Sequence, residues 1–262
     1  MNFTTSQNGI WLFELGGIMV VFLTSSPCDD ATEGVDLPFI LKEENEFVAN
    51  ISKHYVPGSN CLMICAAPDA YEHNDRMARE FKDGFSYHGM VFEEMFMCDA
   101  RNAEHVEEMI QNSSMIILAG GHVPTQNRFF QEIGLREKLQ GFDGVIMGIS
   151  AGTMNCADVV YAQPEEAGES IDPEYQKFLK GLGFTNINVL PHYQMVKDWM
   201  LDGRRLYEDI TFEDSYGQNF YVLVDGSYVV KEKGRTVLYG EAYLLKDGIM
   251  EQICRNAEKI EL

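Results

Sequence analysis

Short runs of consecutive apolar residues recur through the first half of the chain. Continuous apolar stretches rich in β-branched side chains are typical of strands that are buried on both faces of a parallel sheet. The runs that fit this description are 18–24, 61–66, 90–97, 115–119 and 144–149. Between them, apolar positions recur at the spacing of a helix with one buried face. The helices predicted on this basis cover residues 38–55, 74–87, 103–111 and 125–139.

The alternation of strands and helices predicts the fold class. Helical crossovers between successive strands make the strands parallel and cover both faces of the sheet. We therefore expect an α/β fold with a doubly wound, mostly parallel sheet. Further helices are predicted at 172–182 and 196–210, and a further strand at 187–190. Residues 2–17 are expected to be irregular, with an edge strand at 10–13 as the alternative.

The pattern changes to a series of short strands near the C-terminus. The predicted strands are 221–224, 227–231, 235–239 and 242–245. Asp-Gly or Lys-Gly pairs, typical of hairpin turns, stand at 225–226, 233–234 and 247–248. We expect this part to be an antiparallel β extension of the same domain. Residues 1–262 are thus predicted to form one domain, with ample length for a large core.

A serine stands at the turn after the strand predicted at 144–149. The segment 148–152 has the sequence Gly-Ile-Ser-Ala-Gly, and a helix is expected to begin at its end. A serine at the apex of a strand–turn–helix unit is typical of a nucleophile elbow, whose backbone requires small neighbours. Ser150 is therefore the candidate nucleophile, and the N–H of Ala151 is a candidate oxyanion donor. The alternative is a glycine-rich turn with an idle serine.

The net charge excludes two classes of partner. The chain has 41 acidic and 20 basic residues, which gives a formal net charge of −21. Nucleic acids and anionic membranes bind basic surfaces, so neither is expected as a partner. We interpret the acidity as a determinant of solubility, since it does not by itself show that the substrate is basic.

Cysteine spacing and hydropathy indicate a cytoplasmic protein. None of the six cysteines forms a Cys-x-x-Cys pair, and most stand in apolar runs, which predicts buried, reduced thiols rather than a metal site. No Lys or Arg precedes Lys42, so no signal peptide is expected. The longest apolar stretch, 18–23, is too short to span a membrane.

A nucleophilic serine needs a base, and catalytic groups of open α/β sheets gather at the carboxyl ends of strands. His122 and His192 directly follow predicted strands. His192, preceded by a proline, is the candidate base, and a loop histidine bound to a backbone carbonyl is the alternative. Gly121, in the diglycine before His122, is a candidate oxyanion donor, and a tight strand–helix turn is the alternative. The other histidines, expected to be solvated, are His54, His73, His88 and His105.

Three carboxylates are candidates for the acid that orients the base. Asp225 follows the strand predicted at 221–224, although an aspartate before glycine is also common in an ordinary hairpin turn. Glu165 and Glu166 lie in the acidic loop after the serine turn and are the rival acids. The residues alone leave the choice open.

These motifs together resemble the serine peptidases of the dipeptidase E and cyanophycinase family. The resemblance rests on Gly-Ile-Ser-Ala-Gly at 148–152, Leu-Ala-Gly-Gly at 118–121, Leu-Pro-His-Tyr at 190–193 and Val-Leu-Val-Asp-Gly-Ser-Tyr at 222–228. It extends over roughly residues 18–245 and implies a flavodoxin-like fold akin to class I glutamine amidotransferases, with serine in place of their cysteine.

The resemblance also implies roles for individual residues. Ser150 is implied as nucleophile, His192 as base, and Gly121 and Ala151 as oxyanion donors. The family acid is usually Glu, whereas Asp225 stands at that position, so Glu165 and Glu166 remain alternatives. Characterised members cleave beside aspartyl residues, for which Arg204 and Arg205, on a predicted helix, loosely match the family's arginines. A solvated helix face is the alternative. His122, in the glycine loop, is a departure expected to shape the substrate pocket.

The sequence therefore predicts a cytoplasmic serine hydrolase that cleaves a peptide bond in small peptides, aspartyl peptides among them. No metal ion or organic cofactor is required, and the sequence is compatible with a homo-oligomer without fixing one. An α/β-hydrolase esterase is the second interpretation, although its usual order, Ser–acid–His, would require an acid before His192. The third is a binding or regulatory module that keeps the fold without turnover.

Overall fold

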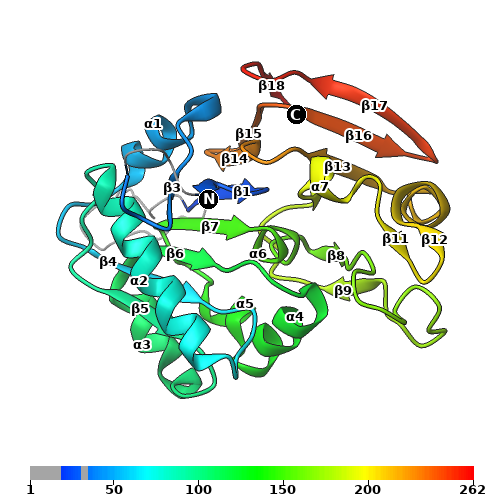
Figure 1. Cartoon of the computed structure of the whole chain (residues 1–262). Helices are drawn as coiled ribbons and strands as arrows, with labels where there is room; N and C mark the ends of the chain where they lie inside the picture. Colours follow the sequence, from blue (N-terminus) through cyan, green and yellow to red (C-terminus); the bar gives the residue numbers. More distant parts are fainter. Residues whose placement is uncertain (1–18, 31–34) are drawn as a thin grey trace, which may run out of the picture.

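The computed structural model describes residues 19–30 and 35–262 (Figure 1). The edge strand predicted at 10–13 lies outside these residues. The central element is an eight-stranded sheet with the order β18-β15-β14-β1-β7-β6-β4-β5. Its strands are β1 (Val20–Thr24), β4 (Asn60–Ile64), β5 (Met95–Cys98), β6 (Ser113–Leu118), β7 (Val145–Ile149), β14 (Tyr228–Glu232), β15 (Arg235–Tyr239) and β18 (Lys259–Glu261).

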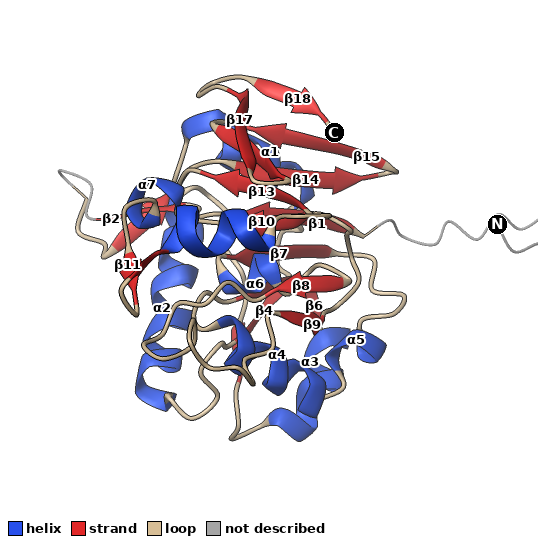
Figure 2. Ribbon diagram, turned by 90° about the vertical axis from the view of Figure 1, so that its right-hand side faces the viewer, coloured by secondary structure: helices blue, strands red, loops and turns tan. Residues whose placement is uncertain are grey.

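Five neighbouring strands of this sheet, β1, β7, β6, β4 and β5, are parallel. The antiparallel strands β14, β15 and β18 extend the sheet beyond β1 (Figure 2). The parallel strands lie side by side in the order β5-β4-β6-β7-β1. If β4 to β7 are numbered 1 to 4 along the chain, the order is 2-1-3-4, as in flavodoxin-like folds, and β1 takes the fifth place. The predicted α/β fold with a mostly parallel sheet is confirmed, because each buried apolar run forms a strand at or near its predicted position. The third run is the exception in length, since only its C-terminal half is a strand.

Helices connect the parallel strands. They are α1 (Phe47–Ile51), α2 (Tyr71–Tyr87), α3 (Val106–Gln111), α4 (Val123–Glu132) and α5 (Leu135–Lys138), with 3-10 turns at Glu44–Glu46, Ser52–His54 and Ala103–His105. Right-handed crossovers place α1 and α2 on one face and α3 to α5 on the other, because the chain reverses its direction along the sheet after β5. The single helix predicted at 125–139 is divided at Gly134, whose φ of 62° ends the helical geometry.

The predicted helix at 38–55 is wrong in its first part. Residues Phe39–Leu41 form β3, which pairs antiparallel with β2 (Cys28–Asp30). Ile40 and Leu41 are buried, and the Phe39 ring contacts Phe81 of α2 at a centroid distance of 4.7 Å. Burial against α2 in an extended conformation therefore overrides the helical spacing of these residues.

A second sheet, on the right in Figure 1, has the order β10-β13-β16-β17. Its strands are β10 (Asn188–Leu190), β13 (Asn219–Leu223), β16 (Ala242–Lys246) and β17 (Ile249–Cys254). The predicted hairpins at 233–234 and 247–248 are confirmed. The hairpin predicted at 225–226 is wrong, because β13 belongs to the second sheet and β14 to the central one. Asp225 therefore lies where the chain crosses between two sheets.

The helix predicted at 172–182 is also wrong, and the one predicted at 196–210 is wrong except near its end, where Leu206–Thr211 forms a π-helical turn. The first range contains β9 (Phe178–Lys180), which pairs with β8 (Val159–Tyr161). The second contains the hairpin of β11 (Met200–Leu201) and β12 (Arg204–Arg205), whose turn residues Asp202 and Gly203 have φ values of 51° and 79°. Such a turn cannot continue a helix. The remaining elements are α6 (Ala151–Met154), α7 (Tyr193–Val196), a π-helical turn at Leu206–Thr211 and α8 (Phe212–Asp214).

The turn from β7 to α6 is packed too tightly to accept side chains at its glycines. A Cβ atom at Gly148 would lie 2.7 Å from the Thr153 Cα, and one at Gly152 would lie 2.1 Å from the Leu118 carbonyl oxygen. The close packing of the backbone therefore explains why both positions of the sequence motif are glycine. Among the described residues, no helix is long and apolar enough to cross a lipid bilayer.

We expect Gly152→Ala to destabilise the protein by about 3 kcal/mol or more, because its Cβ would overlap backbone rather than a movable side chain. The control is Gly58→Ala. Gly58 has a φ of +71° but open space around its Cβ position, so only backbone strain of about 1 kcal/mol is added. Urea unfolding of the two variants measures the difference. Equal losses would contradict the packing of the turn against β6.

Candidate active site

Four residues singled out in the sequence line one pocket at the carboxyl ends of the strands. Gly121 follows β6, Ser150 follows β7, His192 follows β10, and Asp225 follows β13. The pocket has a volume of about 430 Å³. Residues far apart in the chain therefore meet at the edge of the sheets where ligands of α/β proteins usually bind.

Ser150 lies at the apex of the turn in an unusual backbone conformation. Its φ of 51° and ψ of −113° are sparsely populated by residues with a side chain, so its conformation must be held by its surroundings. The Ser150 N–H donates to the carbonyl oxygens of Thr24 and Ser25, both at 3.2 Å. The end of β1 thus supports the strained turn.

His192 is held from two sides. Its Nδ1–H donates to Asp225 Oδ1 at 2.7 Å, and its backbone N–H donates to Ser25 Oγ at 2.8 Å. Its φ of 59° is left-handed, which is uncommon for a residue with a side chain and requires such anchoring. With Nδ1 bound to a carboxylate, Nε2 is the ring nitrogen left to accept a proton.

Asp225 accepts hydrogen bonds from three side chains. Besides His192, these are the Ser25 hydroxyl at 2.6 Å and the Gln194 amide at 2.5 Å. The Asp225 N–H in turn donates to Gln194 Oε1 at 3.1 Å. Burial alone would raise the pKa of Asp225. The hydrogen bonds and charge of His192, with the bonds from Ser25 and Gln194, outweigh burial and lower that pKa.

Ser25 and Gln194 are site residues that the sequence reasoning missed. Ser25 is fully buried, directly after β1, and it bridges Asp225 and the His192 backbone. A polar residue at the carboxyl end of a predicted buried strand was the available signal. Gln194 carried no comparable signal, since only the turn at His192 brings it beside Asp225.

The glycine loop after β6 lies directly beside the serine turn. A Cβ atom at Gly120 would be 3.4 Å from Ser150 Cβ, and one at Gly121 would be 2.6 Å from Ala66 Cβ. Gly121 has a φ of 153°, which also disfavours a side chain. Ala151 is the first residue of α6, so its N–H has no intrahelical acceptor by position. Gly121 has no side chain and Ala151 has a small one, so both leave the space that an oxyanion site beside their N–H groups requires.

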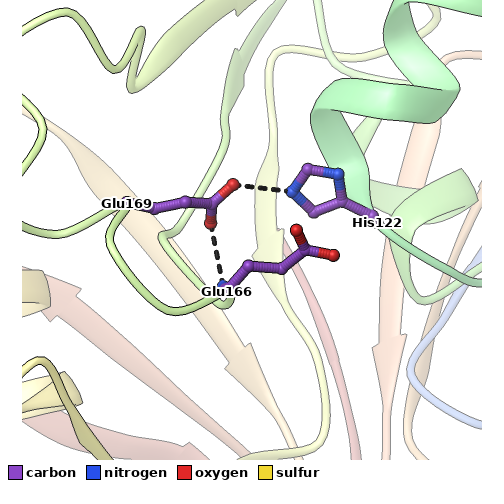
Figure 3. A group of neighbouring side chains, drawn as sticks. All are labelled: His122, Glu166 and Glu169. Carbon is purple, nitrogen blue, oxygen red and sulfur yellow. Dashed lines mark hydrogen bonds and ion pairs between the residues drawn. The ribbon is translucent and has the colours of Figure 1, made fainter.

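His122 lies outside the pocket lining and binds the acidic loop instead (Figure 3). Its Nε2 donates to Glu169 Oε1 at 2.8 Å, while Thr125 Oγ1 lies 2.8 Å from Nδ1. Figure 3 shows the Glu166 carboxylate turned towards the imidazole. The ligand atoms of His122, Glu166 and Glu169 lie within 4.8 Å of one another, a donor set that could hold a divalent cation. His122, which was predicted to contact the substrate, therefore lies outside the pocket lining and is bound to Glu169.

The three candidate acids occupy different places. Asp225 contacts His192, Glu165 Oε1 accepts the Val123 N–H at 3.3 Å, and Glu166 lies beside His122. Burial raises the pKa of Glu165, which lines the pocket. Of these three, Asp225 is the one that forms a hydrogen bond with the imidazole of His192.

Arg204 and Arg205 lie on β12 rather than on the predicted helix. Arg204 contacts the Asp209 carbonyl and the Glu213 carboxylate, and Arg205 binds Asp209 through two nitrogens at 3.0 and 2.6 Å. Neither arginine lines the pocket. Along the described pocket wall, Lys42 is the only Lys or Arg.

Comparison with known proteins identifies one matching family and solved structures with a similar fold. The model of peptidase family S51 matches residues 42–238. A peptidase from an acI-B1 Actinobacterium superposes with a TM-score of 0.62 at 16% identity, covering 94% of this chain and 98% of that one. A protein provisionally assigned as peptidase E from Listeria monocytogenes EGD-e gives 0.56 at 14%, covering 90% and 99%. No curated protein matches the sequence.

We expect Ser25→Ala to raise the pKa of Asp225, because the carboxylate loses one of its donors. The wild-type pKa is lowered, so the stabilisation it provides is present above the ordinary value of about 4 and is lost as the pH falls through the folded-state value. NMR titration of ¹³C-labelled aspartate carboxyls measures the change. Ser26→Ala is the control, since Ser26 Oγ makes a 3.4 Å contact with the Cys28 carbonyl instead. An unchanged Asp225 titration would contradict the assigned network.

Proposed function

The chain belongs to peptidase family S51, and on that premise we propose that it is a serine peptidase that cleaves small peptides. The observation that carries the serine mechanism is the 2.7 Å hydrogen bond from His192 to Asp225 in the pocket that Ser150 lines. A pocket of about 430 Å³ is in the range that holds small organic ligands and suits a substrate of a few residues.

The proposed reaction begins with attack of Ser150 Oγ on the scissile carbonyl. His192 Nε2 takes the hydroxyl proton, and the Asp225 carboxylate stabilises the imidazolium that forms. The N–H groups of Gly121 and Ala151 bind the oxyanion of the tetrahedral intermediate. Collapse breaks the C–N bond, and the amine leaves with the proton from His192. Water, deprotonated by His192, then attacks the ester carbonyl of the acyl-enzyme. The bond to Ser150 Oγ breaks, and His192 returns the proton to that oxygen as the acid product leaves.

The supporting contacts explain how this arrangement can be held before substrate binds. Ser25 fixes both the backbone of His192 and the carboxylate of Asp225, and Gln194 holds Asp225 from the other side. Preorganised donors are effective because they need not reorient during the reaction. In this mechanism Ser25 and Gln194 act as positioning residues.

The aspartyl preference implied by the resemblance has weaker support than the triad. It requires a cation near Ser150, and Arg204 and Arg205 are bound to Asp209 and Glu213 outside the pocket. Lys42 is bound to Asp29. We therefore propose that the protein cleaves a peptide bond in a small substrate, without an aspartyl preference.

The two other interpretations are tested by the order of the site residues and by reactivity. The contact partner of His192 is Asp225, which follows it in the chain, whereas α/β-hydrolase esterases have the order Ser–acid–His. A non-catalytic module with this fold would leave Ser150 unreactive. Four further points stay predictions: the cytoplasmic location, the single domain, the absence of a required cofactor and the homo-oligomeric state.

We expect a fluorophosphonate probe to label the wild-type protein at Ser150 and to leave Ser150→Ala unlabelled. Loss of the nucleophile should also reduce peptide hydrolysis by several orders of magnitude without loss of the fold. Mass spectrometry of the labelled peptide, with circular dichroism as the folding control, makes the measurement. Labelling of a different serine, or activity of Ser150→Ala within about tenfold of wild type, would refute the mechanism.

Asp225→Asn is expected to lower kcat by at least about a hundredfold, because an amide would stabilise the wrong imidazole tautomer. Glu165→Gln and Glu166→Gln should keep kcat within about tenfold, since neither residue contacts His192. Steady-state kinetics of the three folded variants on one peptide ranks them. The reverse ranking would move the acid to the loop.

A further inference from the structure

We propose that Gln126 and Asn155 are positioning residues that hold the glycine loop after β6 in a fixed place beside the serine turn. Both would serve the proposed function, on which this inference rests, because Gly121 of that loop and Ala151 of α6 are its oxyanion donors. The support is a chain of buried side-chain amides that connects the loop to α6.

The glycine loop has little of its own to fix its conformation. Gly120 and Gly121 have no side chains to pack, and glycine loses more conformational freedom on folding than any other residue. An oxyanion donor must nevertheless keep its place, since a misplacement of about 1 Å can cost about a hundredfold in rate. The loop therefore needs support at its ends.

Two side-chain amides bind the two ends of the loop. Gln126 Nε2 donates to the carbonyl oxygen of Ala119, immediately before the diglycine, at 2.7 Å. Asn155 Nδ2 donates to the carbonyl oxygen of Val123, the first residue of α4, at 3.3 Å. The same nitrogen donates to Gln126 Oε1 at 3.0 Å. The two ends of the loop are thus connected to each other through one pair of amides.

Asn155 connects this pair to the second oxyanion donor. It directly follows α6, and its backbone N–H donates to the Ala151 carbonyl oxygen at 2.9 Å. From the other side, Asn127 Nδ2 donates to Asn155 Oδ1 at 2.8 Å and to the Lys180 carbonyl oxygen at 3.0 Å. Because Asn127 engages Oδ1, the amide of Asn155 is oriented with its nitrogen towards the loop. The amides therefore fix the Gly121 N–H relative to the Ala151 N–H.

Burial makes this arrangement rigid. Gln126 and Asn155 are 0% exposed, and Asn127 is 3% exposed. Among the described residues, every buried nitrogen and oxygen of these three side chains has a hydrogen-bond partner. Hydrogen bonds are stronger where the dielectric is low, and a fully satisfied buried network specifies one geometry. Apolar side chains would fill the same volume without fixing the carbonyl groups of the loop.

The rigidity matters when the tetrahedral intermediate forms. Negative charge then develops on the substrate oxygen, and donors that are already in place need not reorient. Gln126 and Asn155 are not among the described residues that line the pocket, so neither contacts the substrate. Loss of either amide is therefore expected to slow the chemical step and to leave peptide binding nearly unchanged.

The test replaces each amide singly. Gln126→Met keeps the length of the side chain, and Asn155→Ala removes the amide at the other end of the loop, so one variant can decide if the other fails to fold. Each should lower kcat for one peptide by at least about tenfold with KM within about twofold, because the lost interaction acts in the transition state. The double variant should lose little more than the more impaired single variant, since both amides act as one unit.

Asn60→Ala is the matched control. The Asn60 side chain also links two backbone segments, since it donates to the Asn112 carbonyl oxygen at 3.0 Å and accepts the Glu94 N–H at 3.1 Å. These contacts lie at the amino end of β4, away from the serine turn. Asn60→Ala should therefore keep kcat within about twofold of the wild type while it lowers the stability measured by urea unfolding.

A measurement without turnover separates this inference from the proposed function. The order parameter of the Gly121 N–H, obtained from ¹⁵N relaxation, should be about 0.85 in the wild type and in Asn60→Ala, and below about 0.6 in Gln126→Met and Asn155→Ala. Absence of hydrolysis by the wild type would refute the proposed function, and the order parameter would then decide the role of the amides. A Gly121 as rigid as in the wild type, or an active wild type whose kcat is kept within about twofold by either folded variant, would overturn the inference.

Discussion

The hydrogen bond between His192 and Asp225 depends on a chain that crosses between two sheets. His192 follows β10 of the second sheet, Asp225 lies between β13 of that sheet and β14 of the central one, and Ser25 follows β1. Ser25 binds the other two residues at 2.6 and 2.8 Å. The same residue accepts the N–H of Ser150 through its carbonyl. One buried serine therefore links the strained serine turn to the imidazole and its carboxylate.

Local pattern was sufficient to predict the parallel strands of the central sheet and the serine turn. Strands such as β1 and β7 are buried along almost their whole length, so their sequences are apolar at consecutive positions and predict their own structure. The glycines at 148 and 152 are required by contacts within the adjacent backbone. Gly121, Ser150, His192 and Asp225 were predictable because each follows a strand within three residues. Their meeting at one edge is typical of open α/β sheets.

The remaining errors arise where distant contacts decide the structure. Asp225-Gly226 has the sequence of a hairpin turn, yet β14 pairs with β1, about 200 positions earlier in the chain, and not with β13. The segment containing Arg204 has helical spacing, but the turn at Asp202 folds it into a hairpin, and Asp202 accepts hydrogen bonds from Gly168 and Ser170. Ser25 belongs to no motif, and its only signal was a polar side chain at the end of a predicted buried strand. Its role follows from contacts with residues far away in the chain.

The net charge of the whole chain and the charges that line the pocket have different physical effects. A net charge of −21 is by itself a property of solubility, and it cannot define a substrate. A carboxylate in a pocket has a different effect, because low-dielectric walls concentrate its field and exclude part of the screening solvent. Asp225 illustrates this effect, because hydrogen bonds from His192, Ser25 and Gln194 lower its pKa although burial would raise it. The contacts of this one carboxylate with its three donors therefore determine its ionisation, and the net charge of the chain does not.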